Sequence, residues 1–306
     1  MRAIVLVPLV LLVVACGGSQ EPGPPALLDV TIVDSGERRS KAFRLTNGRL
    51  TPLEGPLGRR TVFSRTGSEP DRQSIVWEEI YLREADGMER QLTRDRRADL
   101  APQLLRDGRV AFVSCTFREN IAPACTLDTI EPGSGNRETL LDDLGIVFGG
   151  RLSPDESTFL FSRIHESGVP AGLFVRELEG GAERRLADGA SGTWSPDGRR
   201  IAFVSDRDEN GRCLFHDCTG QAGEIYVADA DGSDQQRLTT NPQVDGTPAW
   251  SGDGTWLVSG RIPDEEADWD LYAVRADGAC ERQLTDTPRW EVGAIWHGGG
   301  HGGLDC

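Results

Sequence analysis

WSPDGRRIAFVS, at residues 194–205, is the stretch that decides the fold, because related copies recur along most of the chain. The copies are WSGDG at 250–254, LSPDE at 152–156, and LLRDG at 104–108 with VAFVS at 110–114. Successive copies lie about 40 to 56 residues apart, a period typical of propeller blades and other stacked arrays. The sequence therefore predicts a repeat protein and not a single-copy enzyme fold.

A second predicted hairpin follows the first in several repeats. Residues 80–93, 225–239 and 271–285 each place an Asp-Gly pair between two short apolar runs. Gly accepts the positive φ of a tight turn and Asp tolerates it, so the flanking β-formers can pair in register. The Ser-Pro-Asp-Gly segment serves the first hairpin, because Pro presets φ and Gly closes the turn. Two hairpins in each repeat give four strands, which predicts the blades of a β-propeller.

The number of repeats predicts a closed ring. Turns of the first kind fall near residues 56, 106, 154, 196, 252 and 298, which indicates six blades. The last repeat has room only for a strand at 291–296, and residues 30–46 resemble the missing second hairpin of a repeat. We expect an all-β, six-bladed propeller of four-stranded antiparallel blades over residues 28–306. Pairing of N- and C-terminal strands would close the ring and remove its exposed edges.

These repeats resemble the TolB-like, WD-repeat-like propeller family. Its repeats carry a Trp-Ser-Pro-Asp-Gly turn, an Ile-Ala-Phe strand, and an Ile-Tyr-Val plus Asp-Gly hairpin that ends in Leu-Thr. The resemblance covers residues 50–296 and is strongest for the repeats that end at Leu238 and Leu284. It implies a six-bladed ring that binds proteins or glycans of the cell envelope. A fold alone does not identify the ligand.

The N-terminus has the layout of a bacterial lipoprotein signal. Met1 and Arg2 precede an apolar run over residues 3–14, which is too short for a transmembrane helix. Val13-Val14-Ala15-Cys16 matches a lipobox, so we expect residues 1–15 to be removed and Cys16 to be lipidated; an ordinary cleaved signal is the alternative. Residues 16–27 would form a flexible tether. We expect an extracytoplasmic protein anchored at the periplasmic face of an outer membrane or at the cell surface.

The cysteine count fits an oxidising compartment. The chain has 7 cysteines, and setting Cys16 aside leaves an even number. Local pairing predicts three disulfides, and the alternative of metal binding is disfavoured because no Cys-x-x-Cys pair occurs. The predicted pairs are Cys115–Cys125, Cys213–Cys218 and Cys280–Cys306, the last of which would fasten the C-terminal tail to the ring.

The net charge of -16 and the pI near 4.7 disfavour nucleic acid and anionic phospholipid as partners, because both would be repelled. We expect a monomeric ring that contacts the membrane only through its lipid anchor.

One face of the predicted ring carries the variable loops. The loops that join second to third strands emerge on the same face as the connections between blades, and we call it the insertion-bearing face. These loops cover residues 65–78, 116–126, 163–172, 206–223 and 261–269. Candidate binding residues are three acids that precede first strands, and three residues within the insertions. They are Asp99, Asp245 and Glu291, and Trp77, Asp264 and Trp269. The alternative is that the carboxylates are solvated loop residues and turn caps.

One insertion has the spacing of a calcium loop. Asp206, Asp208 and Asn210 alternate, Gly211 follows, and Asp217 takes the twelfth position. Oxygen ligands at this spacing, with a glycine at the bend and a distal carboxylate, suit Ca²⁺. Ser-Asp-Arg-Asp is also ordinary sequence after the second strand in the resembled family.

Catalysis finds little support in the sequence. No Gly-x-Ser-x-Gly motif occurs, and of the 4 histidines only His297 and His301 are close together. We expect a non-enzymatic protein without a cofactor, calcium excepted, that binds another envelope protein through the insertion-bearing face. A glycan-binding protein is one alternative. A metal-dependent, polysaccharide-degrading enzyme is the other, because the resemblance extends to propeller lyases whose metal is held by histidines.

Overall fold

The structure is a computed structural model that describes most of the chain. The described residues are 26–34, 37–53, 58–66, 78–95, 97–118, 121–165, 170–208, 223–241, 243–262, 269–286, 290–296 and 300–306. Within these ranges all regular secondary structure is β-strand. In chain order they are β1 (Ala26–Asp34), β2 (Glu37–Thr46), β3 (Arg49–Pro52), β4 (Thr61–Thr66), β5 (Glu78–Arg83), β6 (Glu89–Gln91), β7 (Ala98–Leu104), β8 (Val110–Arg118), β9 (Ile121–Ile130), β10 (Arg137–Leu141), β11 (Val147–Leu152), β12 (Thr158–Ile164), β13 (Pro170–Glu177), β14 (Arg184–Ala187), β15 (Ala190–Trp194), β16 (Arg200–Ser205), β17 (Glu224–Asp229), β18 (Gln236–Arg237), β19 (Val244–Asp245), β20 (Ala249–Trp250), β21 (Trp256–Ile262), β22 (Asp270–Arg275), β23 (Glu281–Gln283) and β24 (Trp290–Trp296).

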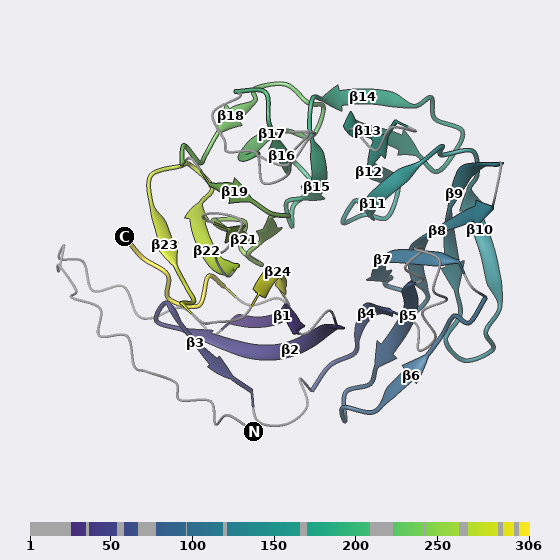
Figure 1. The fold of residues 1–306 in the computed structure, drawn as a ribbon, viewed down its shortest axis with the longest axis horizontal. Coiled ribbons are helices and arrows are strands. Elements are labelled where there is room, and N and C mark those ends of the chain that lie inside the picture. The colour runs from purple at the N-terminus through teal and green to yellow at the C-terminus, as the bar shows by residue number, and fades with distance from the viewer. Residues whose placement is uncertain are drawn as a thin grey trace.

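The described strands form antiparallel sheets around a central axis, which makes the chain an all-β propeller (Figure 1). We number the sheets around the ring. Sheet 1 is β24-β1-β2-β3, sheet 2 is β4-β5-β6, sheet 3 is β7 to β10, sheet 4 is β11 to β14, sheet 5 is β15 to β18, and sheet 6 is β19 to β23. In sheet 6 the short strands β19 and β20 both pair with β21, so together they fill one innermost position.

The prediction of six four-stranded blades is wrong in its count. The described residues form five complete blades of four or more strands, and sheet 2 has three strands. The chain itself gives the reason. Only residues 53–60 separate β3 from β4, whereas residues 188–199 separate β14 from β16 and include the innermost strand β15. The shorter segment leaves little room for a connection, an innermost strand and a turn.

The ring is closed by its two ends, as predicted. β1 pairs antiparallel with β24, from Leu28 opposite Trp296 to Val33 opposite Trp290, and also pairs with β2. The first and last strands therefore share sheet 1, where the purple and yellow ribbons lie side by side (Figure 1). This pairing gives the C-terminal strand a partner and leaves no open edge between the two ends of the array.

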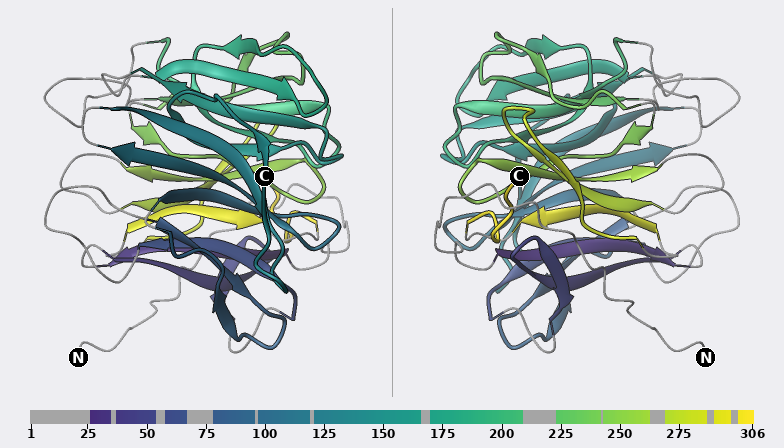
Figure 2. Two further views of the ribbon diagram at one scale, coloured as in Figure 1. Left: turned by 90° about the vertical axis from the view of Figure 1, so that its right-hand side faces the viewer. Right: turned by 90° about the vertical axis from the view of Figure 1, so that its left-hand side faces the viewer.

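The core lies between neighbouring sheets. Successive residues of a strand point to opposite faces of the sheet, so each second strand supplies two interfaces. In β12, Phe159 and Phe161 pack against sheet 3, and Leu160 packs against sheet 5. The other described interfaces are built alike, and all of these side chains are almost fully buried. Figure 2 shows the sheets edge-on, with their strands running between the two faces of the ring.

The Ser-Pro-Asp-Gly turns are held by their own side chains. In sheet 5, Ser195 Oγ donates to Asp197 Oδ1 at 2.6 Å, and Oδ1 also accepts from the Arg199 backbone N–H. Gly198 has a φ of 71°, which favours glycine at this position. These hydrogen bonds, the serine bond first, lower the pKa of Asp197. The turns of sheets 4 and 6 repeat this arrangement, and we call the side of the ring that carries them the turn-bearing face.

An arginine stacked on aromatic rings recurs near the insertion-bearing face. The guanidinium carbon of Arg163 lies 4.9 Å from the Phe174 ring centre, and its nitrogens bind Glu183. Sheets 2 and 6 repeat the unit with Arg65, Tyr81 and Glu89, and with Arg261, Tyr272 and Glu281. Serine replaces this arginine in sheets 3 and 5, where Arg137 and Arg207 reach the rings instead.

Two of the predicted disulfides form in the structure. Cys115 and Cys125 lie opposite each other in β8 and β9, with their Cα atoms 4.1 Å apart. Cys280, between β22 and β23, is joined to Cys306 at the C-terminus. The predicted pair Cys213–Cys218 lies outside the described residues.

Replacing both Cys280 and Cys306 with serine should lower the free energy of unfolding by about 3 kcal/mol, because the bridge closes a long loop in the unfolded chain. The two cysteines are 26 residues apart. Urea unfolding of the oxidised protein measures the effect. Dithiothreitol should lower the midpoint of the wild type but change the double variant less. Equal midpoints for oxidised wild type and variant would contradict the prediction.

Candidate functional site

The acids predicted to line the insertion-bearing face lie at the starts of innermost strands. Asp99 is in β7, Asp245 is in β19, and Glu291 is in β24. Asp99 is 0% exposed and Asp245 is 2% exposed, so both carboxylates lie beneath the surface. The side chain of Glu291 is outside the described set. Asp99 and Asp245 are therefore buried beneath this face and are not exposed on it.

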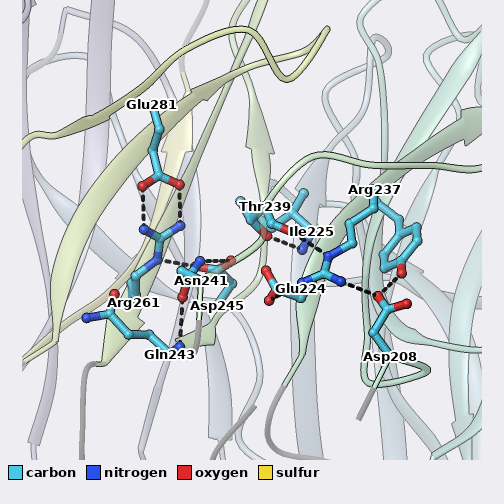
Figure 3. Close-up of polar contacts among 11 residues, drawn as sticks. Asp208, Glu224, Ile225, Arg237, Thr239, Asn241, Gln243, Asp245, Arg261 and Glu281 are labelled. Atoms are coloured by element: carbon cyan, nitrogen blue, oxygen red, sulfur yellow. Dashed lines mark hydrogen bonds and ion pairs between the residues drawn. The ribbon is translucent and has the colours of Figure 1, made fainter. Parts of the chain in front are cut away.

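Asp245 forms a buried ion pair with Arg261 (Figure 3). Arg261 is itself 2% exposed, and its other nitrogens bind both oxygens of Glu281 at 2.6 Å. Burial raises the pKa of Asp245, and the Arg261 charge opposes that shift. Burial also acts to lower the pKa of Arg261, but Glu281 and Asp245 more than offset it and raise that pKa. Arg261 is therefore a permanently charged bridge between β19 and β23.

A second ion-pair group in sheet 5 lies next to the first (Figure 3). Arg237 binds Glu224 at 2.8 Å, Asp208 at 3.2 Å and the Thr239 carbonyl at 2.6 Å. The Tyr226 hydroxyl donates to Asp208. Burial, and then the hydrogen bond to Asp208, raises the pKa of Tyr226 to about 12. The phenol therefore stays protonated as a donor to Asp208 near neutral pH.

Backbone hydrogen bonds join the two groups into one network. The Asp245 N–H donates to the Gly223 carbonyl at 3.1 Å, and the Asn241 side chain donates to Asp245 at 3.3 Å. Thr239 Oγ1 accepts from the Ile225 N–H at 2.8 Å. Asp208 and Gly223 belong to the longest predicted insertion, residues 206–223, and are the described residues on either side of 209–222. The network thus fixes both ends of that insertion to sheets 5 and 6.

Sheet 3 has a related arrangement around Arg137. This guanidinium lies 2.6 Å from Asp128, 2.5 Å from Asp95 and 3.7 Å from Asp99. Within the described parts of the chain, neither carboxylate oxygen of Asp99 has a hydrogen-bond partner. Burial raises the pKa of Asp99, and Ser114 is the first of the groups that oppose the shift.

The structure places only some of the other predicted site residues. Trp269 is half-buried beside the network, where it packs on Val244 and Ile262. Trp77 and Asp264 lie outside the described residues.

The predicted calcium loop is also described only in part. Asp206 is exposed, Asp208 is paired with Arg237 and Tyr226, and Asn210 and Asp217 lie outside the described residues. In the portions of the chain with described side chains, no three His, Cys, Asp or Glu residues are grouped so as to hold a metal ion. The calcium loop stays a prediction.

The arginines of this site were not among the residues predicted from the sequence. Arg261 takes the position at which Ser205 ends the corresponding strand, and Glu281 begins the fourth strand of the same repeat. Arg65 with Glu89 and Arg163 with Glu183 repeat that pairing at the same phase, so the signal was present. The position of Glu224 also recurs, because Gln91 binds Glu79 in sheet 2 and Gln283 binds Asp270 in sheet 6.

The fold and the site define an acidic, disulfide-containing β-propeller. No protein-family model matches the chain. It is 30% identical over 127 residues, 40% of its length, to the Tol-Pal system protein TolB of Anaeromyxobacter dehalogenans (strain 2CP-C), and the match covers 26% of that protein. The chain therefore spans about a quarter of this relative, and its repeats are TolB-like.

Solved structures agree on the fold. TolB from Acinetobacter baumannii superposes with a TM-score of 0.62 at 19% identity, over 90% of this chain and 67% of that one. An oligogalacturonate lyase in complex with manganese has a TM-score of 0.50 at 13% identity, over 87% and 74% of the two chains. At such identities the likeness concerns the propeller fold alone. Where the structure describes the chain, it contains no helix of the length and apolar character that a membrane crossing requires.

Replacing Arg261 with methionine should lower the free energy of unfolding by about 3 to 5 kcal/mol at pH 7, because Asp245 would remain as a buried, unpaired charge. The raised pKa of Asp245 means that the folded state holds its proton more tightly than the unfolded state. The loss should therefore shrink as the pH falls and grow as it rises through the folded pKa. Urea unfolding at several pH values measures this.

Arg163→Met is the matched control for that experiment, because Arg163 and Glu183 are each about a quarter exposed and should contribute about 1 kcal/mol or less. Adding Asp245→Asn to Arg261→Met should recover part of the loss. Equal losses for the two arginine variants, independent of pH, would contradict a buried ion pair.

Tyrosine absorbance provides a separate measurement, because the chain has 3 tyrosines. Tyr226 should titrate near pH 12 in the folded protein, and Tyr226→Phe should remove that step. A pKa raised above the unfolded value of about 10 stabilises the fold below pH 10, and the stabilisation is lost between about pH 10 and 12. Completion of all tyrosine titration by pH 11 in folded protein would contradict the hydrogen bond to Asp208.

Proposed function

We propose that this protein is a lipid-anchored module of the cell envelope that binds another envelope protein through its insertion-bearing face. The observation that carries the proposal is the buried network beneath that face. Its members hold Asp208 and Gly223, near the two ends of the insertion 206–223, against sheets 5 and 6. Binding loops held on a rigid scaffold lose less conformational entropy when they engage a partner.

The partner should be basic where it meets this face. The chain has 49 acidic and 33 basic residues, and the exposed side chains of Asp206 and Asp286 lie in loops of the insertion-bearing face. Opposite charge on the partner would raise the association rate and favour correct docking. The similarity to TolB, which is named a Tol-Pal system protein, supports a protein and not a glycan as the ligand.

The proposed location follows from chemistry at two places in the chain. Disulfides such as Cys115–Cys125 are typical of oxidising compartments outside the cytoplasm. Cys16 of the lipobox, which lies outside the described residues, would carry the lipid anchor. Residues 16–27 would then hold the ring away from the bilayer.

A metal-dependent lyase is less well supported by the described histidines. His165 is exposed, and His301 is held by Asp253 at 2.9 Å in the C-terminal tail. His165 lies in an insertion, and His301 lies beside the first-hairpin turn of sheet 6, so the two histidines are on opposite faces of the ring. His216 and His297 lie outside the described residues.

Cross-linking mass spectrometry in intact cells tests the proposal. The full lipoprotein should yield a reproducible protein partner, and Asp206→Lys with Asp286→Lys and Trp269→Ala should abolish that cross-link. The control carries Glu179→Lys and Asp229→Lys, two exposed acids on the turn-bearing face, and should keep the partner. No partner for any folded version, or loss in the control alone, would contradict binding through the insertion-bearing face.

Membrane fractionation separates the anchor from the binding face. Cys16→Ser should release the protein from the membrane fraction, because one lipidated residue supplies the attachment. The released protein should still bind the partner in vitro. A Cys16→Ser protein that remains in the membrane fraction would contradict lipid anchoring.

A further inference from the structure

The C-terminal tail packs against sheets 6 and 1 on the turn-bearing face. His301 Nδ1 lies 2.9 Å from Asp253 Oδ2, and Arg282 donates to Asp305 Oδ1 at 3.2 Å. Between these polar ends, Leu304 is 2% exposed and packs in the apolar cluster of the two sheets. The tail thus docks by a basic group, an aliphatic side chain and a carboxylate.

The turn chemistry leaves one oxygen of Asp253 for the tail. Ser251 and Thr255 donate only to Oδ1, so Oδ2 remains for His301. Burial would raise the pKa of Asp253, but the hydrogen bonds from Thr255, Ser251 and His301 lower it to about 2. The acceptor for the tail is therefore a permanent anion. The Gly48 N–H, in the second-hairpin turn of sheet 1, completes the dock by donating to the Gly302 carbonyl.

A cleft of about 580 Å³ lies at the corresponding place between sheets 4 and 5. The repeat positions match: Asp155 takes the place of Asp253, and Arg184 takes the place of Arg282. Asp231, in the second-hairpin turn of sheet 5, corresponds to Asn47 beside the tail. Val175, Ala182 and Trp194 give this cleft its apolar lining.

Two polar groups of the cleft, Asp155 and Arg184, correspond to those that hold the tail, and Arg106, Glu177 and Asp197 line the cleft as well. Ser153 and Ser157 donate to Asp155 Oδ1, which lowers the pKa of Asp155 and leaves Oδ2 without a described partner. Arg184 donates to the Asp231 carbonyl at 2.6 Å and pairs with no carboxylate among the described side chains. The side chain of Arg184 is exposed and available to a ligand.

The other sheets lack this pair of groups where the structure describes them. Arg109 takes both oxygens of Asp107 in sheet 3, and Gln236 replaces the arginine in sheet 5. Sheet 2 carries Arg90, but its first-hairpin turn has Gly58-Arg59-Arg60 in place of the aspartate. Among the described residues, only sheets 4 and 6 have both the arginine and a turn aspartate whose Oδ2 is not used by the turn.

We propose that the cleft between sheets 4 and 5 binds a segment of a partner protein that has the chemistry of this chain's own tail. The segment presents a basic side chain to Asp155, an aliphatic side chain to Val175 and Trp194, and a carboxylate to Arg184. The site lies on the face opposite the insertions and does not depend on the function proposed for them. Its failure and the failure of that function are therefore separate outcomes.

The probe is a fluorescent peptide, Gly-His-Gly-Gly-Leu-Asp-Ser, which copies residues 300–306 with serine for Cys306. Fluorescence anisotropy with the full, disulfide-bonded chain should show one saturable site. Arg184→Glu should weaken binding at least tenfold, because the peptide carboxylate would meet a like charge. Gln236→Glu adds the same charge at the equivalent position of sheet 5, outside the cleft, and should leave binding within twofold.

A charge-swapped peptide with lysine in place of its aspartate keeps the test decisive. It should bind Arg184→Glu more tightly than wild type, which a merely unfolded variant would not do. Absence of binding to wild type at millimolar peptide overturns the proposal. So does equal weakening by Gln236→Glu, or retention of wild-type affinity by Arg184→Glu.

Discussion

Pairing of β1 with β24 is the constraint on which the rest of the structure depends. Each sheet of a propeller buries its two faces against its neighbours, so an unclosed ring would expose one face at each end of the array. Leu28 of β1 is 0% exposed because sheet 6 covers it, and sheet 6 is covered in return. The same junction is fastened again by Leu304 and by the Cys280–Cys306 disulfide. The two ends of the chain are thereby used to stabilise one interface.

A stacked arginine gives the insertion-bearing face its regular base. Arg65, Arg163 and Arg261 occupy the same position in their repeats, and their guanidinium groups stack on aromatic rings of the third strand. A guanidinium held over a ring gains about 0.5 to 2 kcal/mol, depending on its desolvation. Where serine takes that position, Arg207 stacks on Tyr226 of the third strand in sheet 5, and Arg137 stacks on Phe112 of the second strand in sheet 3. The stacked arginine comes from different positions in different sheets and therefore meets different carboxylates, for example Glu183 at Arg163 and Asp128 at Arg137.

The sequence predicted what depends on local chemistry. Asp-Gly turns, alternating strands and the spacing of repeats located the hairpins and the closing pair, and nearby cysteines indicated Cys115–Cys125. Properties that depend on two distant segments were missed. Asp99 and Asp245 were predicted as binding residues of the insertion-bearing face, but their burial depends on how β7 and β19 pack, and for Asp245 on the Arg261 side chain of β21. The three-stranded sheet 2 was not predicted. Residues 53–60, which precede its first strand β4, are seen to be a short connection only when β3 is known to end at Pro52.

Arg184 has the repeat position of Arg282 but a different partner. Some described arginines form ion pairs, as Arg60 does with Glu84, and others, such as Arg106 and Arg200, bond backbone carbonyls. Arg184 bonds a backbone carbonyl of the next sheet, and its charge, after the hydrogen bonds from Ser233, helps to lower the pKa of Asp231. The equivalent Arg282 meets its carboxylate only because the tail brings Asp305 to it. Because Arg184 lines the cleft at the repeat position of Arg282, it is placed to bind a carboxylate as Arg282 does, which is the basis of the site proposed between sheets 4 and 5.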